Sequence, residues 1–207
     1  LPITTVVYDI NATDVDSSDT ITFSISGTDE ALFTVDSNDG EVRLKTSADF
    51  ETKNSYSFNI IATDNGAGTL SSAKAVTLSV NNLNDPPSIT SGATGTIAEN
   101  SSISTIAYDA QATDPDGNSI TFSITGTDAS LFTIDSDDGE VRLKNSANFE
   151  VKNSYSFNVV ATDNGSTPAN STKAITINVT DQNDVPITVN DTSITTLNTA
   201  KNNIDVT

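Results

Sequence analysis

Hydrophobic and polar residues alternate along several short stretches of this chain. Ile21, Phe23 and Ile25 alternate with threonine and serine, and residues 56–60 and 76–80 show the same period of two. This period places apolar side chains on one face of a strand, whereas no stretch shows the period of an amphipathic helix. The pattern therefore predicts an all-β fold of short, half-buried antiparallel strands.

Turn-forming residues separate these stretches. SNDGE at 37–41 and SDDGE at 136–140 each precede a VRL stretch, and Asp, Asn and Gly are the residues that tight hairpin turns favour. We therefore predict a hairpin at each place. The acidic residues of these two turns are expected to be structural or solvated rather than metal ligands.

The sequence contains two copies of one repeat. YDINATDVD at 8–16 recurs as YDAQATDPD at 108–116, an offset of 100. After a one-residue difference near 17–20 the offset becomes 99, and DGEVRLK at 39–45 recurs at 138–144. A repeat of this length indicates two tandem domains, each a β-sandwich of about seven strands.

The domain boundary is predicted at NLNDPPS, residues 82–88. Pro86 and Pro87 each lack a backbone N–H, so a central strand must end before them. The second copy ends alike in DQNDVP, and the last residues resemble the start of a different module. We expect an N-terminally truncated first repeat, a second repeat and the start of a further module at residues 1–85, 86–185 and 186–207.

Composition narrows the functions that this chain can have. The chain of 207 residues carries 9 Lys and Arg against 28 Asp and Glu, a formal charge of −19, which disfavours nucleic acid and anionic membranes as partners. It contains no Cys, His, Met or Trp, so zinc-finger sites, thiol nucleophiles and Ser-His-Asp triads are excluded. No apolar stretch is long enough to insert into a membrane. We expect a protein that is not an enzyme.

Acidic and amide residues recur in four clusters, each just outside a predicted strand. They are a D-x-D after Ala-Thr, an acidic pair around Phe, the aspartate of ATDNG, and the linker at the end of each repeat. The members are Asp14, Asp16, Asp114 and Asp116; Asp49, Glu51, Asn148 and Glu150; Asp64 and Asp163; and Asn82, Asn84, Asp85, Asp181, Asn183 and Asp184.

Two sandwiches stacked end to end would bring several of these clusters together. The junction would gather Asp49, Glu51, Asn82, Asn84, Asp85, Asp114, Asp116 and Asp163. So many carboxylates repel one another unless a cation neutralises them, and Ca²⁺ takes six to eight oxygen ligands in flexible geometry. The alternative is that these are ordinary turn residues on an acidic surface, but four clusters repeated in register favour calcium over that alternative.

The motifs that carry these clusters resemble those of the cadherin repeat. They are A-E-N at 98–100, A-T-D-x-D at 112–116, D-x-E within 48–58, A-T-D-N-G at 62–66 and D-x-N-D-x-P at 181–186. The resemblance covers roughly residues 1–186. It implies two Ig-like Greek-key β-sandwiches that are joined by a calcium-binding linker.

The resemblance also implies which residues bind Ca²⁺. When the family's ligand positions are transferred to the matching residues of this sequence, a carbonyl near Asn118 and eight side chains form the central site. The side chains are Asp49, Glu51, Asn82, Asn84, Asp85, Asp114, Asp116 and Asp163. A half-site at the front would consist of Asp14, Asp16 and Asp64. A half-site toward a next junction would consist of Glu99, Asn148, Glu150, Asp181, Asn183 and Asp184. Incomplete half-sites are expected to bind weakly or not at all.

Three departures from the family pattern weaken the calcium prediction locally. Asn82 stands where an Asp is usual and Pro86 where an Asn is common, so one ion of the central site loses a charge. The first repeat's counterpart of Glu99 would precede Leu1. Asn148 replaces an acid in the second repeat's pair.

The resulting hypothesis is a calcium-binding extracellular module of a larger secreted or cell-surface protein. It would act in adhesion, homophilic or otherwise, or as a spacer that calcium makes rigid. The near-identical repeats resemble those of bacterial surface adhesins, and the absence of Trp excludes Trp-anchored strand exchange. The alternative is a carbohydrate-binding module that binds cell-surface polysaccharide, with Tyr8 and Tyr108 expected to be exposed at strand ends and Tyr56 and Tyr155 in the core.

Overall fold

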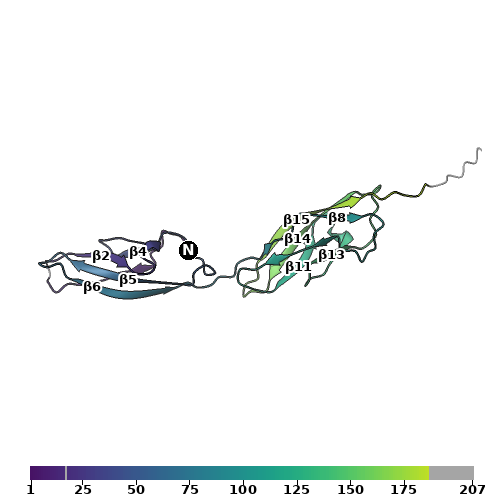
Figure 1. The fold of residues 1–207 in the computed structure, drawn as a ribbon. Helices are drawn as coiled ribbons and strands as arrows, with labels where there is room; N and C mark the ends of the chain where they lie inside the picture. Colours follow the sequence, from purple (N-terminus) through teal and green to yellow (C-terminus); the bar gives the residue numbers. More distant parts are fainter. Residues whose placement is uncertain (17, 187–207) are drawn as a thin grey trace, which may run out of the picture. The chain divides into compact units, whose positions relative to one another are not determined.

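The computed structural model describes residues 1–16 and 18–186, and within these ranges the chain is built from strands and two single turns of 3-10 helix (Figure 1). The all-β prediction is confirmed. The further module predicted at 186–207 lies almost wholly outside the described residues. In the first repeat the elements are β1 (Tyr8–Asp9), β2 (Ile21–Ser26), η1 (Glu30–Leu32), β3 (Phe33–Val35), β4 (Glu41–Leu44), β5 (Ser55–Asp64) and β6 (Ser71–Ser79).

The first repeat consists of two antiparallel sheets with the strand orders β1-β4-β3 and β2-β5-β6. The predicted alternation holds, because Phe23, Phe58 and Val76 point inward from their strands and are at most 9% exposed. Phe33 packs against Phe58 with ring centroids 4.6 Å apart, which joins the two sheets. The core is filled by Ile10, Phe23, Phe33, Val42, Leu44, Tyr56, Phe58, Ile60 and Val76.

The hairpin predicted at SNDGE joins β3 to β4. The Asp36 carboxylate accepts the backbone N–H groups of Asn38 and Asp39 at 2.9 and 3.2 Å, which holds the turn. Gly40 has a φ of +78°, and a Cβ there would lie 2.8 Å from Cβ of Ile10. Glycine is therefore required at this position both by its backbone conformation and by the close approach of Ile10. The second repeat forms the same hairpin.

The second repeat follows the same plan and adds strands that the first does not show. Its elements are β7 (Ser88–Ile89), β8 (Thr94–Ala98), β9 (Tyr108–Asp109), β10 (Ala112–Thr113), β11 (Ile120–Thr125), η2 (Ala129–Leu131), β12 (Phe132–Ile134), β13 (Glu140–Leu143), β14 (Ser154–Asp163) and β15 (Asn170–Thr180). The strand orders are β12-β13-β9 and β11-β14-β15-β8, with β7 paired to β10. β8 runs parallel to β15, whereas β10 with β7, β12 with β13 and β13 with β9 pair antiparallel.

The predicted burial of the tyrosine side chains is confirmed for two of them and wrong for Tyr108. Tyr56 and Tyr155 are core residues, each 7% exposed, as their phase with neighbouring phenylalanines indicates. Tyr108 was expected at the surface but is only 6% exposed. Its hydroxyl donates to Oγ of Ser91 at 2.8 Å, because the segment that leads into β8 passes over the ring. Tyr8, its counterpart, is half-buried.

Each repeat also contains an ion pair that its pattern of apolar residues does not predict. Asp29 is 7% exposed, accepts the backbone N–H of Ser57 at 2.7 Å and pairs with the Lys53 ammonium at 3.1 Å. Asp128 and Lys152 repeat the pair in the second repeat at 3.0 Å. These contacts fasten the 3-10 turn to the start of the long strand β5 or β14.

The chain divides into two compact units whose limits differ from those of the repeats. The first unit contains residues 1–90 together with 111–121 and 161–171, and the second contains the remaining residues. The linker and the two second-repeat loops that carry Asp114, Asp116 and Asp163 therefore belong to the same unit as the first repeat. The predicted boundary at residues 85 and 86 stays a prediction.

Candidate calcium site

The D-x-D loop of the second repeat is organised around Asp114. Oδ1 of Asp114 accepts the backbone N–H groups of Asp116 and Asn118 at 3.0 and 3.1 Å, so the loop folds back on its own carboxylate. Oδ2 of the same carboxylate is buried and has no hydrogen-bond partner among the described residues. A buried carboxylate oxygen without a partner is costly, and a cation would satisfy it.

The linker approaches this loop through Asp116. Oδ1 of Asp116 accepts the side-chain N–H of Asn82 at 2.8 Å, and Oδ2 accepts the backbone N–H of Asp85 at the same distance. These two donors, led by Asp85, hold the pKa of Asp116 below its usual value. Carboxylate oxygens of Glu51, Asp85 and Asp116 all lie within 4.8 Å of one another.

Glu51 experiences the repulsion that such a cluster produces. A hydrogen bond from its own backbone N–H lowers the pKa of Glu51, but desolvation and the charge of Asp116 outweigh it, so the pKa is raised overall. The ionised form of Glu51 is therefore less favourable beside Asp116 than it would be in an isolated glutamate. A carboxylate with an unfavourable charge beside other carboxylates is typical of a cation-binding site rather than of an ordinary solvated turn.

A second set of contacts joins the linker to the loop of Asp163, which is only 4% exposed. Asn84 donates its side-chain N–H to Oδ2 of Asp163 at 3.0 Å and accepts from the Asn118 amide at 2.8 Å. Burial raises the pKa of Asp163, but hydrogen bonds led by that of Gly165 outweigh it and leave the pKa lowered. A Cβ at Gly165 would lie 1.7 Å from Oδ1 of Asn84, so this approach requires a glycine.

Asp49 lies beside Glu51 of the cluster, and its oxygens also have another partner. The Asp49 carboxylate accepts the backbone N–H and the hydroxyl of Thr52 at 3.1 and 3.0 Å, and these bonds lower its pKa. Asn82 and Asn84 present their amide nitrogen to the carboxylates, and each amide must turn over to offer its oxygen. The structure thus brings Glu51, Asp85 and Asp116 together, and hydrogen bonds place five further residues beside them: Asn82, Asn84, Asp114, Asn118 and Asp163.

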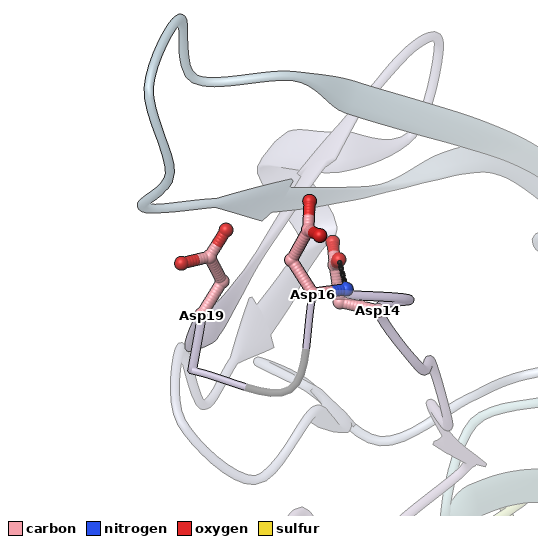
Figure 2. Close-up of side chains that lie close together, drawn as sticks. All are labelled: Asp14, Asp16 and Asp19. Carbon is pink, nitrogen blue, oxygen red and sulfur yellow. Dashed lines mark hydrogen bonds between the residues drawn. The ribbon is translucent and has the colours of Figure 1, made fainter.

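The front of the first repeat carries a cluster that differs from the predicted one. Figure 2 shows the carboxylates of Asp14, Asp16 and Asp19 side by side, with the backbone N–H of Asp16 donating to Asp14 at 2.8 Å. Asp64 is outside this cluster and caps its own loop by accepting from Gly66 at 2.9 Å. Asp19 was missed because it lies where the two repeats differ in length by one residue.

A third cluster consists of Glu99, Glu150 and Asp184 in the second unit. Glu99 is 2% exposed and accepts the backbone N–H groups of Gln182 and Phe149 at 2.8 and 2.9 Å, and these bonds hold its pKa below the usual value. Glu150 has a raised pKa, because desolvation and the Glu99 charge outweigh its own backbone hydrogen bond. Of the other predicted members, Asn148 caps the following turn by accepting from Val151. Asp181 lies beside Glu99, whose pKa it helps to lower, and its carbonyl accepts the side-chain N–H of Gln182. The part of Asn183 in this half-site stays a prediction.

The residues of the central cluster fit Ca²⁺. They offer only oxygen and amide groups, several carboxylates within reach of one ion, and one buried oxygen without a partner. Hard cations with flexible coordination prefer such donors, whereas Mg²⁺ demands a stricter octahedron. Softer transition metals prefer Cys or His ligands, and the sequence has neither.

Comparison with known proteins identifies the family. A model of the cadherin domain matches residues 1–81 and 93–180. The chain belongs to the cadherin family, as its motifs indicate. Its two repeats are tandem cadherin domains, an extracellular module of cell-surface adhesion proteins rather than of enzymes. In the part of the chain that the structure describes, no helix has the length and apolar character needed to cross a membrane.

The relatives are animal proteins that are far longer than this chain. Human protocadherin Fat 1 is 35% identical over 180 residues, which cover 83% of this chain and 4% of that protein. Human protocadherin-1 is 29% identical over 195 residues, which cover 86% of this chain and 18% of that protein. The crystal structure of human protocadherin-24 EC1-2 matches with a TM-score of 0.66 at 23% identity, covers 88% of this chain and 92% of that one, and shows the same fold.

These comparisons correct two functional expectations. The bacterial adhesin is not supported, because the relatives reported are protocadherins of human and mouse and other animal cadherins. The carbohydrate-binding alternative is not supported either, since the family is one of adhesion modules. The burial of Tyr108 also removes one of its two candidate aromatic surfaces.

Proposed function

We propose that this pair of cadherin domains binds Ca²⁺ at the linker and thereby forms a stable, calcium-dependent adhesion or spacer module. The observation that carries the proposal is the convergence of Glu51, Asp85 and Asp116 beside the unpartnered buried oxygen of Asp114. Bound Ca²⁺ would supply positive charge where three carboxylates now repel one another. The domain limits and the full ligand set that the resemblance implies are part of this proposal.

The ligands would come from both sides of the linker. Glu51 and Asp85 would hold the ion from the first repeat and the linker, while Asp114 and Asp116 would hold it from the D-x-D loop. Asp163 and Asn84 already bond each other and would complete the set. Asp49 would join by releasing Thr52. Extracellular modules of this kind bind Ca²⁺ with dissociation constants of about 10⁻⁴–10⁻³ M, so the site would be filled outside cells.

The experiment is a calcium titration by calorimetry together with thermal melting in EDTA and in millimolar Ca²⁺. We expect two or more ions and a marked rise in Tm, because a ligand that binds only the folded state stabilises it. Asp114→Asn should remove much of that rise. The matched control is Asp137→Asn, which removes the same charge from the exposed hairpin turn. Equal behaviour of the two variants would reject the site.

The adhesive role is a further part of the proposal. The family is one of cell-adhesion modules, and the relatives are cadherins and protocadherins. We propose that the module contacts a second copy when calcium is bound. Sedimentation of the chain with and without Ca²⁺, followed by aggregation of chain-coated beads, tests this. A chain that binds calcium yet stays monomeric and leaves beads dispersed would be a spacer only.

A further inference from the structure

Both repeats contain the same exposed asparagine in the same short motif. The motif T-D-N-G stands at residues 63–66, where β5 ends, and again at 162–165, where β14 ends. Asn65 and Asn164 are both exposed. Asparagine is a thermolabile residue, and a following glycine has no Cβ to keep its backbone nitrogen away from the asparagine side chain. Since the motif is identical, a difference in reactivity between the two asparagines comes from the structure around them.

The reaction in question is loss of ammonia from the asparagine side chain, and its only co-reactant is water. The backbone nitrogen of the glycine forms a bond to Cγ of the asparagine, and the bond between Cγ and Nδ2 breaks. The leaving group takes up the proton of the glycine N–H and departs as ammonia, so a cyclic succinimide remains. Water then opens the ring at either carbonyl and gives aspartate or isoaspartate. Before the ring can close, the glycine N–H must leave its hydrogen bond and both residues must rotate.

The structure holds the motif of the second repeat on several sides. The backbone N–H of Asn164 donates to the Ser119 carbonyl at 3.1 Å, and Oδ1 of Asn164 accepts the Ser119 N–H at 3.0 Å. The N–H of Gly165 donates to Oδ1 of Asp163 at 2.9 Å. Asn84 packs closely on Gly165, where a Cβ would lie 1.7 Å from Oδ1 of Asn84. Ring closure at Asn164 has to break these bonds and rotate Gly165 against Asn84.

The motif of the first repeat is held by fewer hydrogen bonds. Oδ1 of Asn65 accepts the N–H of Thr20 at 2.8 Å, and the N–H of Gly66 donates to Oδ1 of Asp64 at 2.9 Å. Among the described residues, no bond from the backbone N–H of Asn65 to the Thr20 carbonyl matches the one from Asn164 to Ser119. Ring closure at Asn65 therefore breaks one hydrogen bond fewer.

The side chains that pack on the two glycines also differ. Asn84, which packs on Gly165, is held by hydrogen bonds with three neighbouring groups. The side chain on Gly66 is that of Asp19, whose Oδ2 would lie 2.3 Å from a Cβ there. The Asp19 carboxylate lies in a cluster with two other aspartates, whose like charges repel it (Figure 2). It is therefore moved aside more easily than the Asn84 amide.

The rest of the loop increases this difference. Gly68 and Thr69 have φ values of +102° and +41°, and a positive φ is unfavourable for a β-branched residue such as threonine. A Cβ at Gly68 would meet nothing within 4 Å, so the loop is not packed there. Thr167 and Pro168 stand at the matching positions of the second repeat, and the proline ring fixes one φ angle. The first loop therefore changes its conformation more readily than the second.

We propose that Asn65 is a site of spontaneous deamidation in the folded chain, and that Asn164, in the same motif, is protected from it. The product adds one negative charge directly after Asp64, at the end of the repeat that carries the front aspartate cluster. Isoaspartate also lengthens the main chain by one carbon atom and so displaces Gly66 from Asp64. The module thereby undergoes a change of charge and loop geometry that accumulates with age. This inference does not rest on the proposed calcium site.

The test follows deamidation of the whole chain at neutral pH and physiological temperature in EDTA, by mass spectrometry of tryptic peptides. Trypsin releases Asn65 within residues 54–74 and Asn164 within residues 153–173, and fragmentation places the mass change within each peptide. We expect Asn65 to convert about fivefold faster than Asn164, the factor that one additional hydrogen bond of ordinary strength is worth. In concentrated urea the two rates should become equal. Equal rates in the folded chain, or a folded Asn65 that stays intact while the urea-unfolded chain converts, would overturn the proposal.

An exchange of loop residues tests the cause of the difference. Gly68→Thr combined with Thr69→Pro gives the first loop the residues of the second and should slow the conversion of Asn65. The reverse exchange, Thr167→Gly with Pro168→Thr, should speed that of Asn164. Thermal melting shows whether each variant is folded, and Asn65→Gln is the control in which the signal at this position disappears. Two folded variants with unchanged rates would mean that the loop does not select Asn65, and the proposal would be wrong. Because every arm is run in EDTA, the outcome is independent of calcium binding.

Discussion

The side-chain amide of Asn82 donates a hydrogen bond to Asp116 at 2.8 Å, so an amide stands where the family usually has a second carboxylate. This bond neutralises part of the charge of Asp116 without a metal ion. Asn82→Asp would replace the donor by a repelling charge. We expect the metal-free chain to become less stable and its calcium affinity to rise on the order of tenfold.

Calorimetry and urea unfolding in EDTA measure the two effects of this substitution. Asn38→Asp is the matched control, because it adds the same charge in the exposed hairpin turn after β3. A tighter calcium site and a weaker metal-free fold, seen only for Asn82→Asp, would support the interpretation. If the two variants bind calcium equally well, Asn82 does not influence the site.

Gly165→Ala addresses the approach of the linker to Asp163. A Cβ would lie 1.7 Å from Oδ1 of Asn84 and must displace that amide from Asp163. We expect weaker calcium binding and a lower Tm in the presence of calcium. Gly92→Ala serves as the control, since a Cβ there meets nothing within 4 Å. A calcium affinity unchanged by Gly165→Ala would mean that Asn84 takes no part in binding.

Much of the fold follows from the sequence because its signals are local. The alternation around Phe23 and Phe58, and the glycine of each hairpin turn, depend on neighbours within a few residues. The burial of Tyr108 depends instead on its contact with Ser91, and Asp29 meets Lys53 and Ser57, which lie 24 and 28 residues further along the chain. Such contacts depend on tertiary packing, which a period of two does not encode.

The candidate site is predictable to a similar degree. The repeated motifs point to Glu51, Asp85 and Asp116, and the structure brings these three together. The motifs do not say which way an amide or a carboxylate turns. Asp49 accepts from Thr52 although it also lies beside Glu51, and Asn82 offers its nitrogen to Asp116, because without a cation these polar groups bond to neighbouring protein groups.

Truncation of Phe58 tests the packing between the two sheets. Phe58 is 2% exposed and contacts the ring of Phe33 at a centroid distance of 4.6 Å. Phe58→Ala should destabilise the first repeat by about 3–5 kcal/mol, through lost burial and a residual cavity. Urea unfolding in EDTA measures the loss. Phe50→Ala, which truncates a half-buried ring outside this core cluster, should cost much less.

The ion pair of Asp29 and Lys53 predicts a pH dependence that is separate from calcium. The backbone N–H of Ser57, and secondarily Lys53, lower the pKa of Asp29 below its ordinary value of 3.8. A carboxyl whose pKa is lower in the folded state adds stability above its unfolded pKa, and this stability disappears as the pH falls through the folded pKa. The contribution of Asp29 is therefore present at neutral pH and lost on acidification below about pH 3.8.

Asp29→Asn keeps an acceptor for Ser57 but removes the charge. We expect the variant to be less stable than the parent chain at pH 7, with the difference shrinking as the pH falls below the unfolded pKa of aspartate. Urea midpoints in EDTA over this range measure the difference at each pH. Asp39→Asn, an exposed turn acid, is the control for general charge effects. Stability curves of the Asp29→Asn chain and the parent that run parallel down to low pH would show that the ionised pair contributes nothing beyond the hydrogen bond.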